Sequence, residues 1–224
     1  MTEKTNGNCF ICGATLSKTV MKNHILKQHG EEENGQECML LKIEGASNKN
    51  YWLFVDIPAE KPLSALENFL LRIWLQCCGH MSEFYQGSSA GYGPNRQKLG
   101  NTRKLGQFAA GTTFFHDYDF GSTTETVITV IGRIRRKPQK DIVRLLARNI
   151  QPVFKCASCE KTAEFINTEE IYNSDNPFYC DECAEKLDID IMLPITNSPR
   201  MGECAYDGEY DTFQFDPGKI MTQK

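Results

Sequence analysis

Two groups of cysteine and histidine residues lie near opposite ends of this 224-residue chain, and their spacing limits what each end can fold into. Near the N-terminus, Cys9-x2-Cys12 is followed by His24-x4-His29. Near the C-terminus, Cys156-x2-Cys159 is followed by Cys180-x2-Cys183. Two cysteines three positions apart can reach one ion from a tight turn, and a second pair completes a tetrahedral shell. The spacing therefore predicts two structural Zn2+ ions. Their ligands would be Cys9, Cys12, His24, His29, Cys156, Cys159, Cys180 and Cys183.

The N-terminal group resembles a zinc finger with two cysteine and two histidine ligands. Leu16 and Met21 fall where that fold places its core hydrophobes, although the spacer between the ligand pairs is one residue shorter than usual. The positions that would read bases hold Ser17, Val20 and Asn23, of which serine is indiscriminate and valine cannot hydrogen-bond. We therefore expect non-specific phosphate contact or protein binding here rather than sequence-specific DNA reading.

The C-terminal group resembles a zinc ribbon, in which two tight turns each present a pair of thiolates. Phe154 precedes the first pair, and Phe178 and Tyr179 precede the second, so we expect these aromatic side chains to pack beneath the turns. All four ligand positions hold cysteine, which leaves no coordination position for a substrate. A closed site of this kind is structural rather than catalytic.

Composition and charge narrow the class of protein. Ten cysteines follow an N-terminus without the apolar core of a signal peptide, which favours metal binding in a reducing, cytoplasmic compartment over disulfides. The chain has no apolar run long enough to cross a bilayer, so we expect no membrane association. The net charge of −4 excludes a global attraction to nucleic acid. Nothing in the sequence predicts an organic cofactor.

The middle of the chain has the pattern of a mixed domain. Strands are expected over 38–43, 51–57, 112–118 and 124–135, and a helix from Ser64 to about Cys77 carries apolar residues at three- and four-residue steps. We predict an α+β fold with a mixed or antiparallel sheet and one main helix, flanked by two small zinc modules. The expected divisions are a disordered tail (1–8), the finger (9–30), a linker (31–36), the α+β core (37–150), the ribbon (151–190) and an irregular acidic tail that packs on the core (191–224).

Two motifs in this middle region carry a family resemblance. Trp74-Leu-Gln-Cys-Cys-Gly-His-Met-Ser-Glu-Phe84 and Tyr118-Asp-Phe-Gly-Ser-Thr-Thr-Glu125 resemble the hallmarks of the plasmid pRiA4b ORF-3-like family. The resemblance covers roughly residues 38–210, and 193–204 is similar to the tail of relatives that carry a zinc ribbon. It implies a link to mobile elements but no established activity, and the chain has no resolvase serine site. Ser122, Thr124 and Thr126 stand where the wider family has an aspartate and a Trp-x-His motif.

Several cysteines and one histidine outside the two zinc patterns have two interpretations each. Cys77, Cys78 and His80 could form a reactive or metal-binding cluster, or the two cysteines could pack as small hydrophobes at a helix end. His80 would then hydrogen-bond locally after Gly79. Cys204 could be a nucleophile or a spare ligand, or a packed thiol.

A second candidate constellation would add residues of the 112–118 strand and the turn that follows it. His116, Asp117 and Asp119 could join His80 and Glu83 in a metal or acid–base site, but alternation along a strand places His116 on one face and the two aspartates on the other. Asp119 before Phe-Gly also suits a turn. The catalytic candidates are accordingly Cys78, His80 and Asp119.

Basic residues cluster in two segments that could contact phosphates. They are Lys18, Lys22 and Lys27 in the finger, and Arg133, Arg135 and Arg136 at a strand end that could equally be solvated. Together the patterns predict a zinc-binding, non-catalytic recognition protein that binds nucleic acid or protein. The alternative is an enzyme of unknown reaction that uses the region of Cys78, His80 and Asp119.

Overall fold

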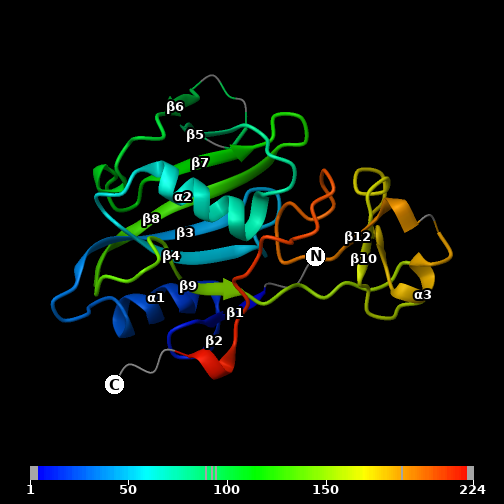
Figure 1. Cartoon of the computed structure of the whole chain (residues 1–224), viewed down its shortest axis with the longest axis horizontal. Coiled ribbons are helices and arrows are strands. Elements are labelled where there is room, and N and C mark those ends of the chain that lie inside the picture. Colours follow the sequence, from blue (N-terminus) through cyan, green and yellow to red (C-terminus); the bar gives the residue numbers. More distant parts are fainter. Residues whose placement is uncertain (1–4, 89, 92, 94, 188, 221–224) are drawn as a thin grey trace.

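A nine-stranded sheet forms the body of the protein (Figure 1), and the computed structural model describes residues 5–88, 90–91, 93, 95–187 and 189–220. The strands lie in the order β2-β1-β9-β4-β3-β8-β7-β5-β6, and all of these pairings are antiparallel. Their bounds are β1 (Asn6–Cys9), β2 (Thr15–Ser17), β3 (Gln36–Gly45), β4 (Trp52–Pro58), β5 (Ser82–Gln86), β6 (Gln97–Leu99), β7 (Thr113–Tyr118), β8 (Thr124–Arg136) and β9 (Arg144–Asn149). The predicted α+β class is confirmed.

Two helices cover opposite faces of this sheet. The helices of the chain are α1 (Lys18–Gln28), α2 (Leu63–Leu70) and α3 (Asp181–Ala184). Met21 of α1 packs in one hydrophobic cluster with Leu40, and Leu66 of α2 packs in another with Leu41. Leu40 and Leu41 are neighbours in β3, and successive strand side chains point to opposite faces. Because both faces are covered, all seven residues of β4 are buried.

The main helix differs in detail from its prediction. It begins after Pro62 rather than at Ser64, and after Leu70 it continues as a π-helical turn over Leu71–Leu75. Proline suits this position because its φ is fixed, and because the N–H that it lacks would have no hydrogen-bond partner at the start of a helix. The turn ends at Gln76, which has extended backbone angles and brings the chain out toward Cys77.

The N-terminal module is part of the main sheet. β1 pairs with β2 on one side and with β9 on the other, so that Gly7 lies opposite Asn149. Residues 6–8 are therefore a strand, and the expectation that they belong to a disordered tail is wrong. The predicted linker is also fixed to the main sheet. Glu32 N–H donates to Arg135 O at 3.0 Å, and the Glu32 carboxylate pairs with Arg144 at 2.7 Å.

A second, three-stranded sheet forms a small lobe beside the main one, at the right of Figure 1. Its strands are β10 (Phe165–Asn167), β11 (Phe178–Tyr179) and β12 (Met192–Pro194), in the order β11-β10-β12. β12 lies beyond residue 190, so this sheet extends into the segment that was expected to be irregular. Short 3-10 turns cover Leu105–Gln107, Ile189–Ile191 and Pro217–Lys219. No helix in the described part of the chain is long and apolar enough to span a bilayer.

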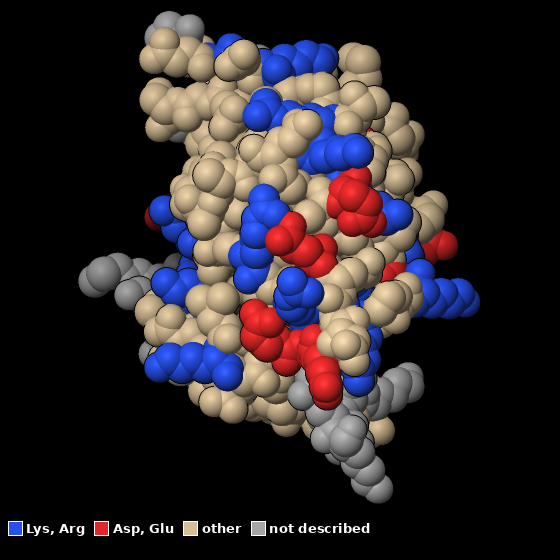
Figure 2. Space-filling view, turned by 90° about the vertical axis from the view of Figure 1, so that its left-hand side faces the viewer, with Lys and Arg blue, Asp and Glu red and all other residues tan. Residues whose placement is uncertain are grey.

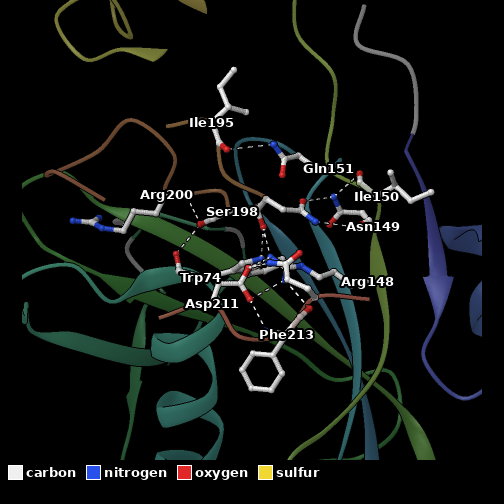
Figure 3. Close-up of polar contacts among 12 residues, drawn as sticks. Trp74, Arg148, Asn149, Ile150, Gln151, Ile195, Ser198, Arg200, Asp211 and Phe213 are labelled. Atoms are coloured by element: carbon white, nitrogen blue, oxygen red, sulfur yellow. Dashed lines mark hydrogen bonds and ion pairs between the residues drawn. The ribbon is translucent and has the colours of Figure 1, made fainter. Parts of the chain in front are cut away.

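The segment after β12 packs back onto the main sheet through buried polar contacts (Figure 3). The Arg148 guanidinium pairs with Asp211 at 2.6 Å, and it also donates to Asn197 O at 2.7 Å. Ser198 Oγ donates to Trp74 O at 2.7 Å, and Trp74 Nε1 donates to Asn197 O at 3.0 Å. These contacts fix the tail against the end of the π-helical turn.

Candidate metal centres

The N-terminal cluster (Cys9, Cys12, His24 and His29) combines a tight turn with a helix. Cys9 ends β1, and the turn after it is closed by Gly13 N–H donating to Cys9 O at 2.8 Å. His24 lies in α1 and His29 is its C-terminal cap. Cys12 Sγ lies 3.2 Å from His24 Nε2, which lies 3.1 Å from His29 Nε2.

The C-terminal cluster (Cys156, Cys159, Cys180 and Cys183) is built from two such turns. Cys156 N–H donates to Lys161 O at 2.8 Å, and Cys180 precedes the first turn of α3. Cys159 Sγ lies 3.5 Å from Cys180 Sγ and 3.7 Å from Cys183 Sγ. Burial raises the pKa of Cys156, but backbone N–H groups that include that of Ser158 outweigh it and bring the pKa to about 6. Hydrogen bonds with Cys159 and Cys180 raise the pKa of Cys183 to about 12, so these contacts favour a thiolate at Cys156 but not at Cys183.

Of the aromatic residues before these turns, Tyr179 packs beside the cysteines as expected, whereas Phe154 and Phe178 pack on each other. The rings of Phe154 and Phe178 are stacked with their centroids 3.9 Å apart. Tyr179 is buried in a small hydrophobic cluster with Ala184 and Met192, where it also lies beside two of the cysteines. The apolar core of this lobe is small, so its order depends strongly on what holds the four cysteines together.

A third set, the central cluster, joins Cys77, Cys78, His80 and Cys204. Cys78 Sγ lies 3.1 Å from His80 Nε2 and 3.6 Å from Cys204 Sγ, and His80 Nε2 lies 3.1 Å from Cys204 Sγ. In each of the three clusters the four ligand atoms all lie within 4.8 Å of one another, so each could hold a metal ion. Cys78 and Cys204 are exposed, and the interpretation of these two as packed thiols is wrong.

Arg200 and Asp119 form a buried ion pair beside the central cluster. The guanidinium of Arg200, which is fully buried, donates to Asp119 Oδ2 at 2.8 Å and to Cys77 Sγ at 3.4 Å. Burial raises the pKa of Cys77, but the hydrogen bond from Arg200 helps to bring it below the usual value. Asp119 Oδ2 also lies 3.4 Å from His80 Nε2. The catalytic candidates Cys78, His80 and Asp119 are thus brought together.

Asp119 reaches His80 because it lies beyond the end of β7. Its φ of 65° turns the backbone, and its Oδ1 accepts from Gly121 N–H at 2.9 Å, which confirms the predicted turn role. Strand alternation therefore does not separate Asp119 from His80. His116 and Asp117 remain in β7 and are fully buried, with Asp117 paired to Arg96 at 2.9 Å. Neither of these two residues joins the cluster.

Arg200 is the site residue that sequence reasoning missed. Its position in Pro199-Arg-Met-Gly-Glu-Cys204, close to the one cysteine of the tail, was the available signal. A buried arginine is rare without a carboxylate partner, but nothing in the pattern links position 200 to Asp119. The pairing depends on the tail's return to the sheet.

The basic residues with predicted phosphate contacts are mostly engaged within the protein. Arg136 is only 1% exposed and pairs with Asp56 at 2.7 Å, so it is removed from the surface and its predicted role is wrong. Lys18 pairs with Glu44, and Arg133 pairs with Glu37. On the face drawn in Figure 2, lysines and arginines alternate with acidic residues rather than forming a continuous basic surface. Lys22, Lys27 and Arg135 remain at least partly exposed.

Two of the hollows on the surface of the described structure lie near the helix α2 and the small lobe. A hollow of about 480 Å3 lies beside α2 and is lined by Phe69, Arg72 and Phe213 among others. A second hollow, of about 360 Å3, lies beside the small lobe and is bordered by Tyr172 and Cys204. Cys78, His80 and Asp119 line neither hollow.

Comparisons with known proteins give likenesses in structure but none in sequence family. Neither the models of known protein families nor the curated proteins match the chain. A solved structure, the crystal structure of protein of unknown function MM3350 from Methanosarcina mazei Go1, is 16% identical in sequence. It aligns with a TM-score of 0.43 over 51% of this chain and 70% of that chain.

Proposed function

We propose that this chain is a zinc-binding, non-catalytic recognition protein whose N-terminal and C-terminal clusters each hold one structural zinc ion. The observation that carries the proposal is that each cluster supplies four side-chain ligands within tetrahedral reach. A site with four protein ligands has no open position for a substrate. Thiolate and imidazole ligands suit zinc better than they suit Mg2+ or Ca2+. Under this proposal the N-terminal cluster is a zinc finger and the C-terminal cluster is a zinc ribbon.

The distances between ligand atoms support zinc as the ion. Zn–S and Zn–N bonds of about 2.3 and 2.05 Å in a tetrahedron place two sulfurs about 3.8 Å apart and two nitrogens about 3.3 Å apart. The C-terminal cluster has S–S distances of 3.5 and 3.7 Å, and the two histidines of the N-terminal cluster are 3.1 Å apart. Free thiol ligands also fit the reducing, cytoplasmic compartment proposed for this chain.

The outer face of α1 is the proposed recognition surface, and its character favours a protein partner. Val20 is 50% exposed and Leu26 is 39% exposed, beside the basic residues Lys22 and Lys27. Exposed apolar side chains rimmed by lysines suit a partner with apolar and acidic groups. A nucleic acid would need several free cations to neutralise phosphates, and Lys18, Arg133 and Arg136 are already paired.

The resemblance to the pRiA4b ORF-3-like family belongs to the same proposal. Its two motifs are adjacent in space, since Ser82 pairs with Tyr118 across β5 and β7 and His80 lies against Asp119. Two motifs that are distant in sequence but meet at one place in the fold support the idea that they belong to one family site. The link to mobile elements that the family implies remains part of this proposal.

Metal analysis and a binding assay test the proposal together. The reduced full-length chain is expected to hold zinc at the N-terminal and C-terminal clusters, with Cys9→Ser and Cys156→Ser each losing one ion. Fluorescence anisotropy with generic duplex DNA and RNA, at low and high salt, tests whether the chain binds nucleic acid. Cross-linking in cells tests whether the chain binds a protein partner, and the number of cross-links to α1 should fall in Val20→Ser. The control is Ile142→Ser, because Ile142 is similarly exposed but lies far from α1 in sequence. The proposal would be refuted if both ligand variants retained all their zinc. It would also be refuted if neither the anisotropy assay nor the cross-linking assay detected binding.

A thiol enzyme is the second candidate, because Cys78 lies 3.1 Å from His80 and His80 lies 3.4 Å from Asp119. Both contacts are made by Nε2 of His80, so this nitrogen would take the thiol proton and the Asp119 carboxylate would stabilise the imidazolium that forms. Alkylation with iodoacetamide separates the two candidates. Rapid labelling of Cys78 at neutral pH in the zinc-loaded chain, slowed in His80→Ala, would favour the enzyme. Protection of Cys78 would favour the recognition protein.

A further inference from the structure

Almost every cysteine and histidine of the chain lies in one of three groups of four. The chain has ten cysteines and four histidines. Cys38 and His116 are the two that lie outside the groups, and all fourteen are within the described residues. Cysteines and histidines that served only to fill the core would be scattered through it, but twelve of these fourteen residues lie together in fours. Their gathering into complete sets of four suggests one common use.

Cys78, His80 and Cys204 have the distances of a tetrahedral zinc site, and Cys77 Sγ lies within 4.8 Å of each of their ligand atoms. A sulfur and a nitrogen bound to one zinc lie about 3.5 Å apart, and two sulfurs lie about 3.8 Å apart. The nitrogen of His80 is 3.1 Å from the sulfurs of both Cys78 and Cys204, which are 3.6 Å from each other. These values match those in the N-terminal and C-terminal clusters, whose spacing had already predicted zinc.

The backbone around Cys204 is arranged to present its thiol. Cys204 and Ala205 have φ angles of 45° and 53°, a left-handed region that costs side-chain-bearing residues free energy. The tail is fixed just before this point by Ser198, whose hydroxyl is bonded to Trp74 O (Figure 3). Trp74 lies three residues before Cys77, so the same contact positions both parts of the cluster.

The surroundings of the cluster suit thiolate ligands. Three thiolates, one neutral imidazole and one Zn2+ carry a net charge of about −1 by ligand counting. Arg200 places a permanent positive charge within 3.4 Å of Cys77 Sγ, and Asp119 holds the guanidinium in place. Outer groups that donate hydrogen bonds to metal ligands and fix their orientation are a regular part of such sites.

From these observations we infer that Cys77, Cys78, His80 and Cys204 bind a third zinc ion, which fastens the C-terminal tail to the main sheet. Each cysteine thiol gives its proton to solvent as its sulfur binds the metal, while His80 binds through the lone pair of Nε2. The two other clusters each have two buried ligands, whereas the central cluster has none. Its zinc is therefore the most accessible of the three and leaves first when a chelator competes.

Zinc content of the reduced, full-length chain tests the inference directly. After zinc loading and gel filtration, the wild-type chain is expected to hold three ions, and Cys78→Ser and Cys204→Ser two each. Cys38→Ser is the matched control and should hold three, because Cys38 is a buried cysteine outside the clusters. Two ions in the wild-type chain, or equal content in Cys204→Ser and Cys38→Ser, would overturn the inference. The proposed zinc finger and ribbon would survive either result.

Cobalt substitution gives a second readout that needs no variant. Charge-transfer absorption from thiolate to Co2+ scales with the number of sulfur–metal bonds, so the three clusters should give the intensity of nine such bonds. Six bonds would count only the N-terminal and C-terminal clusters and would contradict the inference. A chelator added in small excess should first remove the ion with three sulfur ligands. Loss of a four-sulfur or two-sulfur signal first would contradict the order of release.

Discussion

Arg200 is buried with its guanidinium 2.8 Å from Asp119, although the two residues are 81 positions apart in sequence. Removal of the arginine leaves a buried carboxylate without its partner. We expect Arg200→Met to lower the free energy of unfolding by about 3–5 kcal/mol, measured by urea denaturation. Arg133→Met is the control, because its pair with Glu37 is exposed, and it should cost less than about 0.5 kcal/mol. Similar losses in both variants would contradict this account of the buried pair.

The junction between the N-terminal module and the main sheet depends on Gly7. A Cβ atom at this position would overlap Arg148 O and the ring of Trp52. We expect Gly7→Ala to separate β1 from β9, which amide hydrogen exchange in both strands would report. Gly132→Ala is the matched control, because its added Cβ meets nothing within 4 Å. Equal exchange in the two variants would show that the close packing at Gly7 is not needed.

The carboxylate of Glu44 links the first turn of α1 to the sheet. Burial raises its pKa, but hydrogen bonds from Lys18 and Lys42 outweigh this and hold the pKa below its ordinary value of 4.5. The folded state therefore favours the ionised form, and its contribution is complete above pH 4.5 and lost as the pH falls through the lowered pKa. We expect Glu44→Gln to lose about 1 kcal/mol of stability at pH 7. The difference from wild type should shrink toward zero in acid.

Acid also protonates thiolate ligands, so this comparison needs a reference that shares that effect. Glu37→Gln removes a carboxylate whose pair with Arg133 is exposed, and it retains all three clusters. Its stability relative to wild type should stay nearly constant between pH 4 and 7. A Glu44→Gln deficit that is constant or larger in acid would contradict the lowered pKa.

The small lobe should lose its order when the C-terminal cluster cannot hold metal. Its buried apolar set comprises Cys156, Tyr179, Cys180, Ala184 and Met192, of which the two cysteines are proposed zinc ligands. Few hydrophobic contacts therefore remain if the metal is absent. We expect Cys180→Ser to unfold β10, β11 and β12 locally while the nine-stranded sheet persists, as seen by residue-resolved hydrogen exchange. Persistent protection in β10 of this variant would show that the lobe is stable without zinc.

Much of the architecture could be predicted because the signals were local. The cysteines and histidines of the N-terminal and C-terminal clusters lie in short spaced pairs, and the structure brings each predicted set of four together. The residues over 124–135 predicted a strand, and β8 covers Thr124–Arg136 between β3 and β7. The apolar steps from Leu66 to Trp74 marked the face of α2 and its π-helical turn that packs on the sheet.

The remainder depended on contacts between distant segments. Cys204 joins Cys78 across 126 positions, and a single cysteine has no spacing that could reveal its partners. β1 was assigned to a disordered tail because Asn6 to Asn8 are polar, yet the free edge of β9 supplies hydrogen bonds that local propensity does not count. Arg136 looked like a surface cation because Asp56, its partner, lies 80 positions earlier.

The place of β1 beside β9 also has a consequence for the growing chain on the ribosome. β1 is synthesised among the first residues, but the strand that it needs as a neighbour is synthesised after the other seven strands of the same sheet. The helix α1 can pack on Leu40 and β1 can pair with β2 before then, but the junction with β9 forms only after residue 149 has left the exit tunnel. The sheet is therefore completed at this junction only after the whole length of the core has been synthesised.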